Sequence, residues 1–280
     1  MKLFCLTLLA MIAFAANSVL NRLALAGVLI DPASFAVIRL FSGAIILCLI
    51  VLVRSDNRTS LFTCKRNLSV GALLAYMLGF SFAYVSLDTG VGALILFGGV
   101  QITMFAGAVI ARESVSRLKW IGALVAASGL AWFLWPTPDA EISLTGAGLM
   151  GIAALGWGIY SLMGRGAENA TAETAANFAL AAPFSLLALF ALAPNVTFEG
   201  FVLACLSGIV TSGLGYALWY AVLPRLASST AAVAQLSVPI FATLGGVAFL
   251  SEDLTLRFVM AALIVLGGIG LSVVKPRSVR

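Results

Sequence analysis

The chain of 280 residues contains no histidine, and only 10% of its residues are charged. The missing histidine excludes the commonest metal ligand and the commonest proton carrier of proteins. A soluble domain typically carries about 25% charged residues, so this chain has too little charge to cover a surface that faces water. Because 62% of its residues are hydrophobic, the composition predicts an integral membrane protein.

Cysteine is also scarce, and the four cysteines stand alone in the sequence. Cys5, Cys48, Cys64 and Cys205 lack the spacing of a metal site. Three of them lie in apolar runs, where cysteine packs as a small apolar residue. The chain has no phosphate-binding Walker motif. We therefore expect no metal, no cofactor and no direct use of ATP.

Charge of either sign is rare within the apolar runs. The net charge of +5 is not concentrated on one helix or strand, which argues against a nucleic-acid partner. All eleven acidic residues lie between the apolar runs or at their ends, whereas a proton-coupled carrier normally keeps an ionisable group at membrane depth. A membrane enzyme would need a cluster of reactive side chains at the membrane face, and the sequence shows no such cluster. The absence of an acidic residue at membrane depth favours facilitated diffusion over proton-coupled transport.

What the sequence does contain is ten apolar segments, each close to the roughly 20 residues that a membrane-spanning helix needs. These runs do not alternate with polar residues, which favours helices over the strands of a barrel. The first segment resembles a signal peptide, but Asn17, Asn21 and Arg22 interrupt it, so we expect it to remain in the mature protein. The predicted spans are residues 3–25, 33–53, 68–87, 91–111, 118–136, 144–165, 172–193, 199–221, 229–250 and 257–274.

One stretch of the sequence occurs twice. Residues 93–132 align with residues 232–271 after a shift of 139 positions. Both copies consist of an apolar run, a short polar turn and a second apolar run, and the correspondence extends upstream of them. The chain is therefore an internal duplication. Identical residues at equivalent positions include Gly107 with Gly246, Glu113 with Glu252 and, further upstream, Phe35 with Phe178.

This duplication predicts two repeats, residues 3–136 and 144–275, with five apolar segments each. Because five is an odd number, two tandem copies must cross the membrane in opposite directions. The predicted fold is an all-α membrane protein with ten transmembrane helices, arranged as two inverted five-helix repeats. Inverted repeats are typical of transporters that alternate access around a site near the middle of the bilayer.

Lysine and arginine predict the orientation of the chain, because loops on the cytoplasmic side carry an excess of both. With the N-terminus in the cytoplasm, thirteen basic residues fall on the cytoplasmic side and only Arg257 lies in an outer linker. Both termini are then cytoplasmic, as an even number of spans requires. Glu113 and Glu252 lie in equivalent turns on opposite sides, and we interpret both as structural residues that help the following helix to start.

The polar turn has the pattern Gly-x-x-x-x-x-Glu, and an apolar run with glycine follows it, once after Glu113 and once after Glu252. This repeated pattern resembles the EamA repeat of the drug/metabolite transporter superfamily. Trp157-Gly158 with Arg165 eight residues later, and Arg39 near the start of the second segment, are similar to that family as well. The resemblance covers essentially the whole chain. Within the superfamily the chain is similar to bacterial aromatic amino acid exporters of the YddG type, which implies efflux of aromatic amino acids and related metabolites across the inner membrane.

Several aromatic residues are candidates for a substrate site. Tyr76, Phe80 and Tyr84 recur every four residues and so share one face of the third predicted helix. Aromatic rings with hydroxyl groups would suit an aromatic amino acid. Packing and lipid-facing roles are the alternative, and tyrosine near the end of a span is common at the membrane interface. Further aromatic candidates are Trp157 and Tyr160 in the sixth segment and Tyr216 and Tyr220 in the eighth.

Amide side chains inside the apolar runs are the second group of candidates, and Asn17, Gln101 and Gln235 are predicted to contact substrate. A polar group at membrane depth is costly unless it has a partner or lines a wet cavity, and hydrogen bonding between helices is the alternative. Gln101 lies close to Gly98-Gly99, and Gln235 lies close to Pro239, in equivalent segments. Such paired interruptions predict hinges near the binding region.

Arg22 and Arg39 are the only basic residues well inside the predicted spans. A long basic side chain can extend to the membrane interface while its aliphatic part stays in the apolar region, and either residue could do so. The alternative is that Arg39 attracts a substrate carboxylate.

Together with the resemblance, these features predict an amino acid exporter of the bacterial inner membrane that works by alternating access and uniport, and not an enzyme. Its partners would be a small-molecule substrate and the lipid bilayer. A proton-coupled drug/metabolite antiporter of the same superfamily is the alternative, and a channel or a membrane enzyme is a more distant one. Because two five-span halves can enclose a site within one chain, we expect a monomer.

Overall fold

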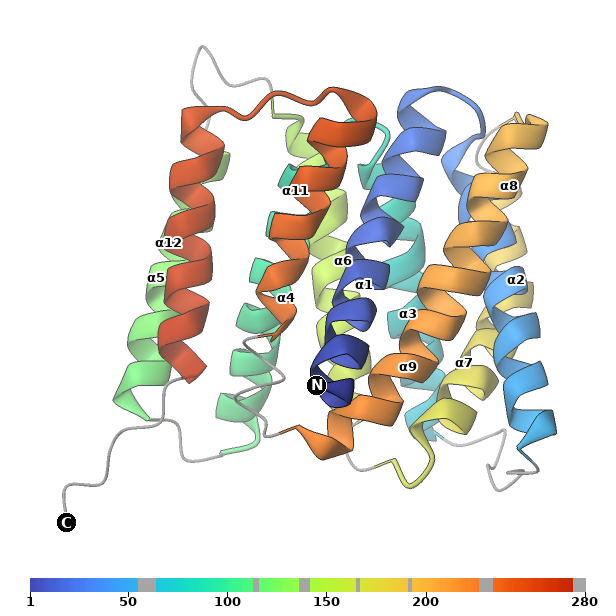
Figure 1. The fold of residues 1–280 in the computed structure, drawn as a ribbon, viewed down its shortest axis with the longest axis horizontal. Coiled ribbons are helices and arrows are strands. Elements are labelled where there is room, and N and C mark those ends of the chain that lie inside the picture. The colour runs from blue at the N-terminus through green and yellow to red at the C-terminus, as the bar shows by residue number, and fades with distance from the viewer. Residues whose placement is uncertain are drawn as a thin grey trace.

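The computed structural model describes residues 1–54, 64–112, 116–135, 142–164, 167–190, 193–226 and 234–273. Within these ranges the chain folds into helices, and no strand is present apart from an isolated bridge between Ile30 and Val196. Each predicted apolar segment is helical over most of its length. The helices stand side by side in a bundle (Figure 1). Their bounds are α1 Lys2–Ala26, α2 Pro32–Val53, α3 Cys64–Ala83, α4 Thr89–Ile110, α5 Arg117–Leu134, α6 Leu144–Met163, α7 Ala170–Ser185, η1 Leu186–Phe190, α8 Phe198–Leu206, η2 Ser207–Leu214, α9 Gly215–Val222, η3 Leu223–Arg225, α11 Ser237–Leu250 and α12 Leu256–Val273.

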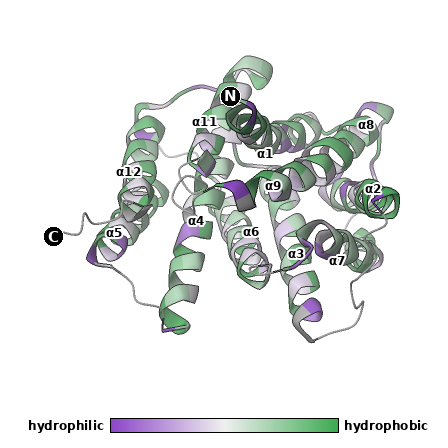
Figure 2. Ribbon diagram, turned by 60° about the horizontal axis from the view of Figure 1, so that its bottom comes forward, coloured by the Kyte–Doolittle hydropathy of each residue, from purple (hydrophilic) through white to green (hydrophobic). Residues whose placement is uncertain are grey.

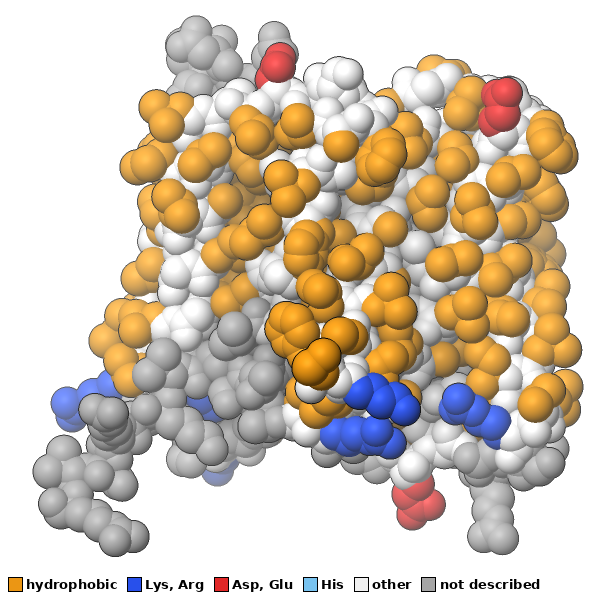
Figure 3. All heavy atoms as spheres, viewed as in Figure 1, with side chains coloured by type: hydrophobic (Ala, Val, Ile, Leu, Met, Phe, Trp, Pro, Cys, Tyr) orange, Lys and Arg blue, Asp and Glu red, His pale blue; other side chains and the backbone are white. Residues whose placement is uncertain are grey.

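Seven helical stretches of the described chain are long and apolar enough to cross a membrane. Apolar residues are spread over all sides of most helices (Figure 2), as expected for helices that face lipid as well as protein. Large apolar side chains also cover the face of the molecule in Figure 3. The chain is therefore a multi-pass membrane protein. The seven stretches are α1, α2, α4, α5, α6, Ala170–Phe190 and Phe198–Val222.

The prediction of ten spans exceeds these seven by three helices, and each exception has a simple cause. α3 has 20 residues, but Arg66 and Asn67 in its first turn lower its hydropathy. The apolar helices Ser237–Leu250 and Leu256–Leu271 are shorter than the other stretches. All three lie within the same bundle as the seven longer stretches (Figure 1).

Polar residues just before the apolar runs define where helices begin. The carboxylate of Asp31 accepts a hydrogen bond from the backbone N–H of Ser34 at 2.8 Å, and Pro32 occupies the first turn of α2. Ser143 and Thr197 cap α6 and α8 in the same way. Such side chains satisfy backbone N–H groups that have no partner inside the helix. This local chemistry explains why the predicted starts of these helices are close to the observed ones.

The first residues of the two predicted polar turns have the same backbone φ. Arg112 follows α4 and Ser251 follows α11, and both have a φ of 54°. Positive φ is uncommon outside glycine, and one such residue often ends a helix. These two residues are 139 positions apart, which is the shift that relates the two predicted repeats.

Helix pairing follows the same relation. In the order of the two predicted repeats, α1 corresponds to α6, α2 to α7, α3 to the stretch α8–η2–α9, α4 to α11 and α5 to α12. α3 packs against α6 and α7, while the stretch α8–η2–α9 packs against α1 and α2. α4 packs against α6, and α11 packs against α1. The pairs α2 with α7, α4 with α11 and α5 with α12 join equivalent helices of the two halves. Exchanging the first half for the second therefore reproduces most of the packing arrangement.

The eighth predicted span is not the uniform helix that the sequence predicted for residues 199–221. Its central part, η2, is a π-helix between α8 and α9. Gly208 in η2 lies so close to α2 that a β-carbon there would collide with the Ser42 hydroxyl and the Arg39 carbonyl. The wider turn places Ser207, Thr211 and Ser212 inside the bundle, where all three are buried. Single π-helical turns within α-helices are frequent at functional sites.

Charged side chains mark the ends of the bundle. Lys2 begins α1, Arg54 follows α2 and Arg117 begins α5, and all three positions lie at the end where α1 starts (Figure 1). On the face seen in Figure 3, Lys and Arg side chains lie at this end only. The turns that contain Asp88 and Glu252 lie at the opposite end.

Candidate functional site

The centre of the bundle contains a cluster of aromatic rings around Trp157 of α6. The Trp157 ring lies 5.0 Å from Tyr76 of α3, 5.1 Å from Tyr216 of α9 and 5.6 Å from Tyr160, measured between centroids. Tyr76, Tyr160 and Tyr216 are 3 to 4% exposed, whereas Trp157 is only partly buried. Helices from both halves therefore meet at this tryptophan.

Further rings extend the cluster on both sides. Phe80 lies 5.4 Å from Tyr76, and Phe14 of α1 and Phe178 of α7 lie 5.7 and 5.9 Å from Tyr216. The term aromatic cluster below refers to Phe14, Tyr76, Phe80, Trp157, Tyr160, Phe178 and Tyr216. Sequence reasoning missed both Phe14 and Phe178 as site candidates: nothing distinguishes Phe14 from the other apolar residues of α1, and Phe178 was noted only as the repeat equivalent of Phe35.

Arg39 of α2 lies against this cluster and is completely buried. Its Nε donates to the Ser212 hydroxyl at 2.9 Å, and its Nη2 donates to the Tyr76 hydroxyl at 3.0 Å. The guanidinium carbon lies 5.1 Å from the centre of the Phe80 ring and 5.4 Å from that of Tyr76. The interpretation that Arg39 extends to the interface is wrong, because its guanidinium points inward to α3 and η2.

The charge of Arg39 has no carboxylate partner among the described residues. Arg22 pairs with Asp88 and Glu252, and Arg66 pairs with Glu173, so these three described carboxylates are bound to other arginines. A buried cation without a counter-ion is costly, and the hydrogen bonds and the two ring faces offset only part of that cost. One nitrogen of the guanidinium, Nη1, is buried and has no hydrogen-bond partner in the part of the chain that the structure describes.

A network of small polar side chains lies on the other side of η2. The Asn17 side-chain oxygen accepts hydrogen bonds from the Ser207 hydroxyl at 2.7 Å and the Thr211 hydroxyl at 3.1 Å. Asn21 donates to the backbone carbonyl of Asn17 at 2.9 Å and accepts from Ser81 at 3.3 Å. Asn17 thus joins α1 to η2 through its own hydrogen bonds. The spacing of Ser207 and Thr211, four residues apart in an apolar run, was a signal for this network.

Two of the predicted tyrosines lie at the edges of the aromatic cluster, and the Tyr84 ring lies 4.8 Å from that of Phe80. Tyr84 is fully buried and donates its hydroxyl to the Thr89 carbonyl at 3.2 Å, so it packs inside the protein and does not face lipid. The reason is that the end of α3 is covered by the start of α4. Tyr220 is half-buried and lies one helical turn after Tyr216 on α9.

The predicted amide pair and hinge residues lie on α4 and near α11. Gln101 of α4 and Gln235, just before α11, are both half-buried, and the described ring contacts and hydrogen bonds do not connect them to the aromatic cluster. α4 runs through Gly98 and Gly99 without interruption. Pro239 is the third residue of α11, where its missing N–H leaves no hydrogen bond unmade.

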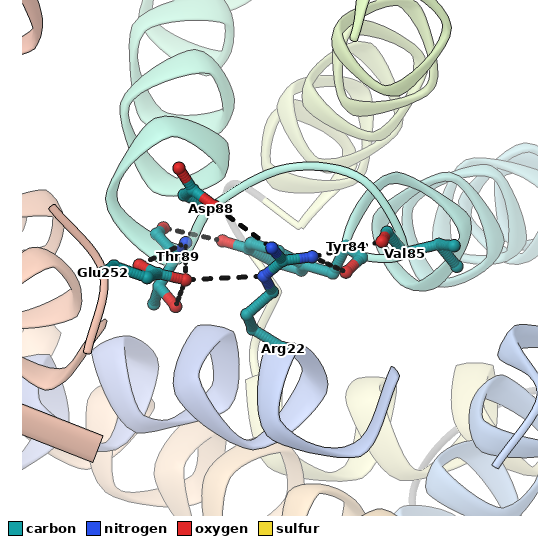
Figure 4. A network of polar contacts seen from close by, with 6 residues as sticks. All are labelled: Arg22, Tyr84, Val85, Asp88, Thr89 and Glu252. Atoms are coloured by element: carbon teal, nitrogen blue, oxygen red, sulfur yellow. Dashed lines mark hydrogen bonds and ion pairs between the residues drawn. The ribbon is translucent and has the colours of Figure 1, made fainter. Parts of the chain in front are cut away.

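A second polar group, the Arg22 network (Figure 4), lies at the end of the bundle opposite the start of α1 (Figure 1). Arg22 of α1 donates to Asp88 at 3.1 Å and to the backbone carbonyls of Tyr84 and Val85 at 3.2 and 3.1 Å. Its Nε lies 3.4 Å from a carboxylate oxygen of Glu252. The network therefore connects α1, the turn after α3 and the turn after α11.

Glu252 caps a helix other than the one predicted. Its carboxylate accepts hydrogen bonds from the backbone N–H of Thr89, 2.9 Å from each oxygen, and from the Thr89 hydroxyl at 2.9 Å (Figure 4). It thus stabilises the positive N-terminal end of α4, not that of α12. Chain order suggested the following helix, whereas the fold brings a distant one closer. The equivalent Glu113, and Arg165, lie outside the described residues.

A third group, the Arg66 network, lies at the other end of the bundle. Arg66 in the first turn of α3 pairs with Glu173 of α7 at 2.8 Å and donates to the Asn177 side-chain oxygen at 3.2 Å. Asn177 in turn donates to the Tyr160 hydroxyl at 3.4 Å. The sequence prediction placed Arg66 in a linker, but α3 begins four residues earlier than predicted and contains it.

Comparison with known proteins bears on what such a bundle does. Residues 144–274 match the EamA-like transporter family. The chain is 43% identical over 274 residues to an uncharacterized protein of Pseudomonas aeruginosa, covering 97% of this chain and 94% of that protein. It is 24% identical to an uncharacterized transporter of Archaeoglobus fulgidus, covering 72% and 74%, and 23% identical to the uncharacterized transporter YoaV of Bacillus subtilis, covering 86% of each.

The fold also has a counterpart among solved structures. The crystal structure of another protein superimposes with a TM-score of 0.65 and covers 94% of this chain and 96% of its own. The two sequences are 20% identical, so this similarity bears on the fold alone.

Proposed function

The chain belongs to the EamA-like transporter family, and we propose that it exports aromatic amino acids and related small amphipathic metabolites by alternating access. The aromatic cluster around Trp157 is the observation that supports this substrate class. Rings offer flat apolar faces, and tyrosine adds hydroxyl groups to them. Helices of both halves contribute to the cluster, as a site between two moving halves requires.

The residues that would contact substrate are those around the exposed part of the Trp157 ring. Tyr76, Phe80, Tyr160 and Tyr216 are almost fully buried, whereas Trp157 is only partly buried. The proposed ligand is planar and stacks on the ring of this tryptophan. The resemblance to aromatic amino acid exporters of the YddG type is consistent with such a ligand.

The proposed mechanism depends on two inverted repeats, residues 3–136 and 144–275. The interchangeable helix pairs support this arrangement, and so do the matching left-handed turns at Arg112 and Ser251. Because each repeat would contribute helices to one site, a single chain is sufficient, and the proposed unit is a monomer.

We place both termini in the cytoplasm of a bacterium and the bundle in its inner membrane. The end where α1 starts carries Lys and Arg side chains on the face seen in Figure 3, which agrees with the excess of basic residues on the cytoplasmic side of membrane proteins. The Arg22 network would then lie at the outer end.

The proposed mode of transport is uniport. Among the described acidic residues, Asp88, Glu173 and Glu252 are held in ion pairs toward the ends of the bundle. A proton-coupled carrier needs an ionisable group near the transported molecule, and none of these carboxylates contacts the aromatic cluster.

The test is the uptake of labelled phenylalanine into liposomes that contain only this protein, with and without an imposed pH gradient. We expect saturable uptake that the gradient does not change. Trp157→Ala should abolish it, whereas Trp135→Ala, which alters a tryptophan that is 69% exposed, should not. Accumulation driven by the gradient would replace uniport by proton-coupled antiport. No flux of any amino acid would contradict the substrate class.

A further inference from the structure

We propose that the site at Trp157 recognises its ligand through a carboxylate, held by Nη1 of Arg39 and the hydroxyl of Tyr216, and that it does not recognise an ammonium group. The substrate class is then an arylalkyl carboxylate, of which an aromatic amino acid is one example. This inference rests on the proposed function and specifies the chemistry of its site.

The first observation is that two buried polar atoms in this region have no partner. Within the described residues, three buried side-chain atoms lack a hydrogen bond: Arg22 Nε, Arg39 Nη1 and the Tyr216 hydroxyl. Arg22 Nε already lies 3.4 Å from a Glu252 oxygen. The other two atoms belong to the aromatic cluster or lie against it. Buried polar groups are almost always hydrogen-bonded, so two exceptions at one place indicate a missing partner.

The second observation is that these two atoms belong to one small region. Ser212, which accepts a hydrogen bond from Arg39, lies one turn before Tyr216 on the same helical stretch. Tyr76 accepts the other hydrogen bond of Arg39, and the rings of Tyr76 and Tyr216 lie 5.0 and 5.1 Å from Trp157. Among the described residues, the Tyr216 hydroxyl has no hydrogen-bond partner.

The third observation concerns charge. Arg39 is completely buried, and the described part of the chain supplies it with hydroxyl groups and ring faces but no carboxylate. A ligand carboxylate would provide the counter-charge and accept hydrogen bonds from Arg39 Nη1 and from the tyrosine. Charge-assisted hydrogen bonds of this kind are about twice as strong as neutral ones.

An ammonium group would find no equivalent partner. Two described carboxylates, those of Glu173 and Glu252, already pair with Arg66 and Arg22, and neither makes a described contact with a residue of the aromatic cluster. The side-chain oxygen of Asn17 already accepts hydrogen bonds from Ser207 and Thr211. The site therefore offers the carboxylate two unpartnered donors, whereas the amino group would find ring faces but no described carboxylate.

Three ligands separate these contributions: 3-phenylpropionate has the carboxylate, phenethylamine has the ammonium, and phenylalanine has both. Their binding to the purified protein in detergent can be measured by isothermal titration calorimetry. We expect 3-phenylpropionate and phenylalanine to bind with dissociation constants within a few-fold of each other, and phenethylamine at least about tenfold more weakly. Equal binding of phenethylamine and 3-phenylpropionate would overturn the proposal, as would the failure of both carboxylates to bind.

Tyr216→Phe is the sharpest variant, because the hydroxyl that it removes has no hydrogen-bond partner among the described residues. Folding should therefore be unaffected. We expect 3-phenylpropionate to bind about tenfold more weakly or worse, since a hydrogen bond to a charged group is lost. Phenethylamine binding to the same variant is the internal control and should not change. An unchanged affinity for 3-phenylpropionate would contradict the assignment of the tyrosine.

Arg39 is tested by a charge-conserving and a charge-removing change. Arg39→Lys should keep part of the preference for the carboxylate, and Arg39→Met should abolish it. If Arg39 only connects helices, both variants would lower all affinities alike, which would overturn its role in recognition.

The site and the transport function can fail separately. If ligands with a carboxylate bind but no flux into liposomes is observed, transport would be refuted but not this site. Flux of phenylalanine that Tyr216→Phe does not alter would refute this site but not transport.

Discussion

Asp31 shows how one side chain at the membrane edge ties the two halves together. One carboxylate oxygen accepts from the Ser34 N–H at 2.8 Å and the other from the Asn195 N–H at 3.0 Å. Asp31 lies in the turn between α1 and α2, outside the membrane-spanning helices. Burial raises the pKa of Asp31, but hydrogen bonds from Ser34, Asn195 and Ala33 outweigh it, so that the pKa is lowered below its usual value.

This lowered pKa predicts how the contribution of Asp31 depends on pH. The stabilisation is fully present above the unfolded pKa, near 3.8, and is lost as the pH falls through the lower folded pKa. We expect Asp31→Asn to unfold more easily than the wild type at neutral pH, by about 1 kcal/mol, and the difference to disappear in acid. Thermal unfolding in detergent over a pH series measures both.

Asp253→Asn is the control for this series, because Asp253 is an exposed acid in another turn. Its effect should be small at every pH. A difference between wild type and Asp31→Asn that stays constant down to strong acid would show that the stabilisation does not come from the charged carboxylate.

At the scale of elements, the position of α6 depends on glycine. A β-carbon at Gly156 would lie 2.6 Å from the Ala72 carbonyl oxygen and 2.7 Å from the Tyr76 backbone nitrogen. α3 and α6 can therefore approach to backbone contact only at a glycine, as is common between membrane helices. Gly151 of the same helix has nothing within 4 Å of its β-carbon position.

Gly156→Ala and Gly151→Ala form a matched pair. The first must push α6 away from α3, and we expect it to lower the free energy of unfolding by about 1–3 kcal/mol. It should also weaken ligand binding, because Tyr76 would shift relative to Trp157. The second should be neutral or stabilise by up to about 1 kcal/mol, since alanine favours a helix more than glycine does. Unfolding and binding in detergent compare the two, and equal effects would contradict the packing explanation.

At the scale of the whole molecule, ion pairs hold the bundle at both ends. The Arg22 network connects the two halves at one end (Figure 4), and Arg66 connects α3 to α7 at the other. The acids of the Arg22 network differ in burial: the Glu252 side chain is 11% exposed and the Asp88 side chain is 52% exposed. Exposed ion pairs contribute little, whereas removing one partner of a buried pair is costly.

Glu252→Gln should therefore lower the free energy of unfolding by about 1–3 kcal/mol, and Asp88→Asn by less than about 0.5 kcal/mol. A double-mutant cycle with Arg22→Gln measures the coupling in each pair and should find it larger for Glu252. Because Glu252 also caps α4 through Thr89, part of its effect should persist when Arg22 is already replaced. A larger coupling for Asp88 would contradict this account.

The sequence by itself determined the helices and most of their bounds. The predicted spans 33–53 and 118–136 correspond to α2 at Pro32–Val53 and α5 at Arg117–Leu134. Apolar run length and the capping residues beside it are local properties, which explains this agreement. The sequence likewise identified three rings of the cluster as candidates: Tyr76 by the regular spacing of rings in its span, Tyr216 by its equivalent position in the second repeat, and Trp157 by the family resemblance.

Only the tertiary structure decided which polar groups face one another. Arg39 meets Ser212, 173 positions away, and Glu252 meets Thr89, 163 positions away. In a soluble protein, the apolar face of a helix marks the interior. Here 62% of residues are hydrophobic, and lipid and core favour the same side chains. Hydropathy therefore cannot tell inward from outward, and the unpartnered Arg39 and Tyr216 atoms emerge only once the helices are packed.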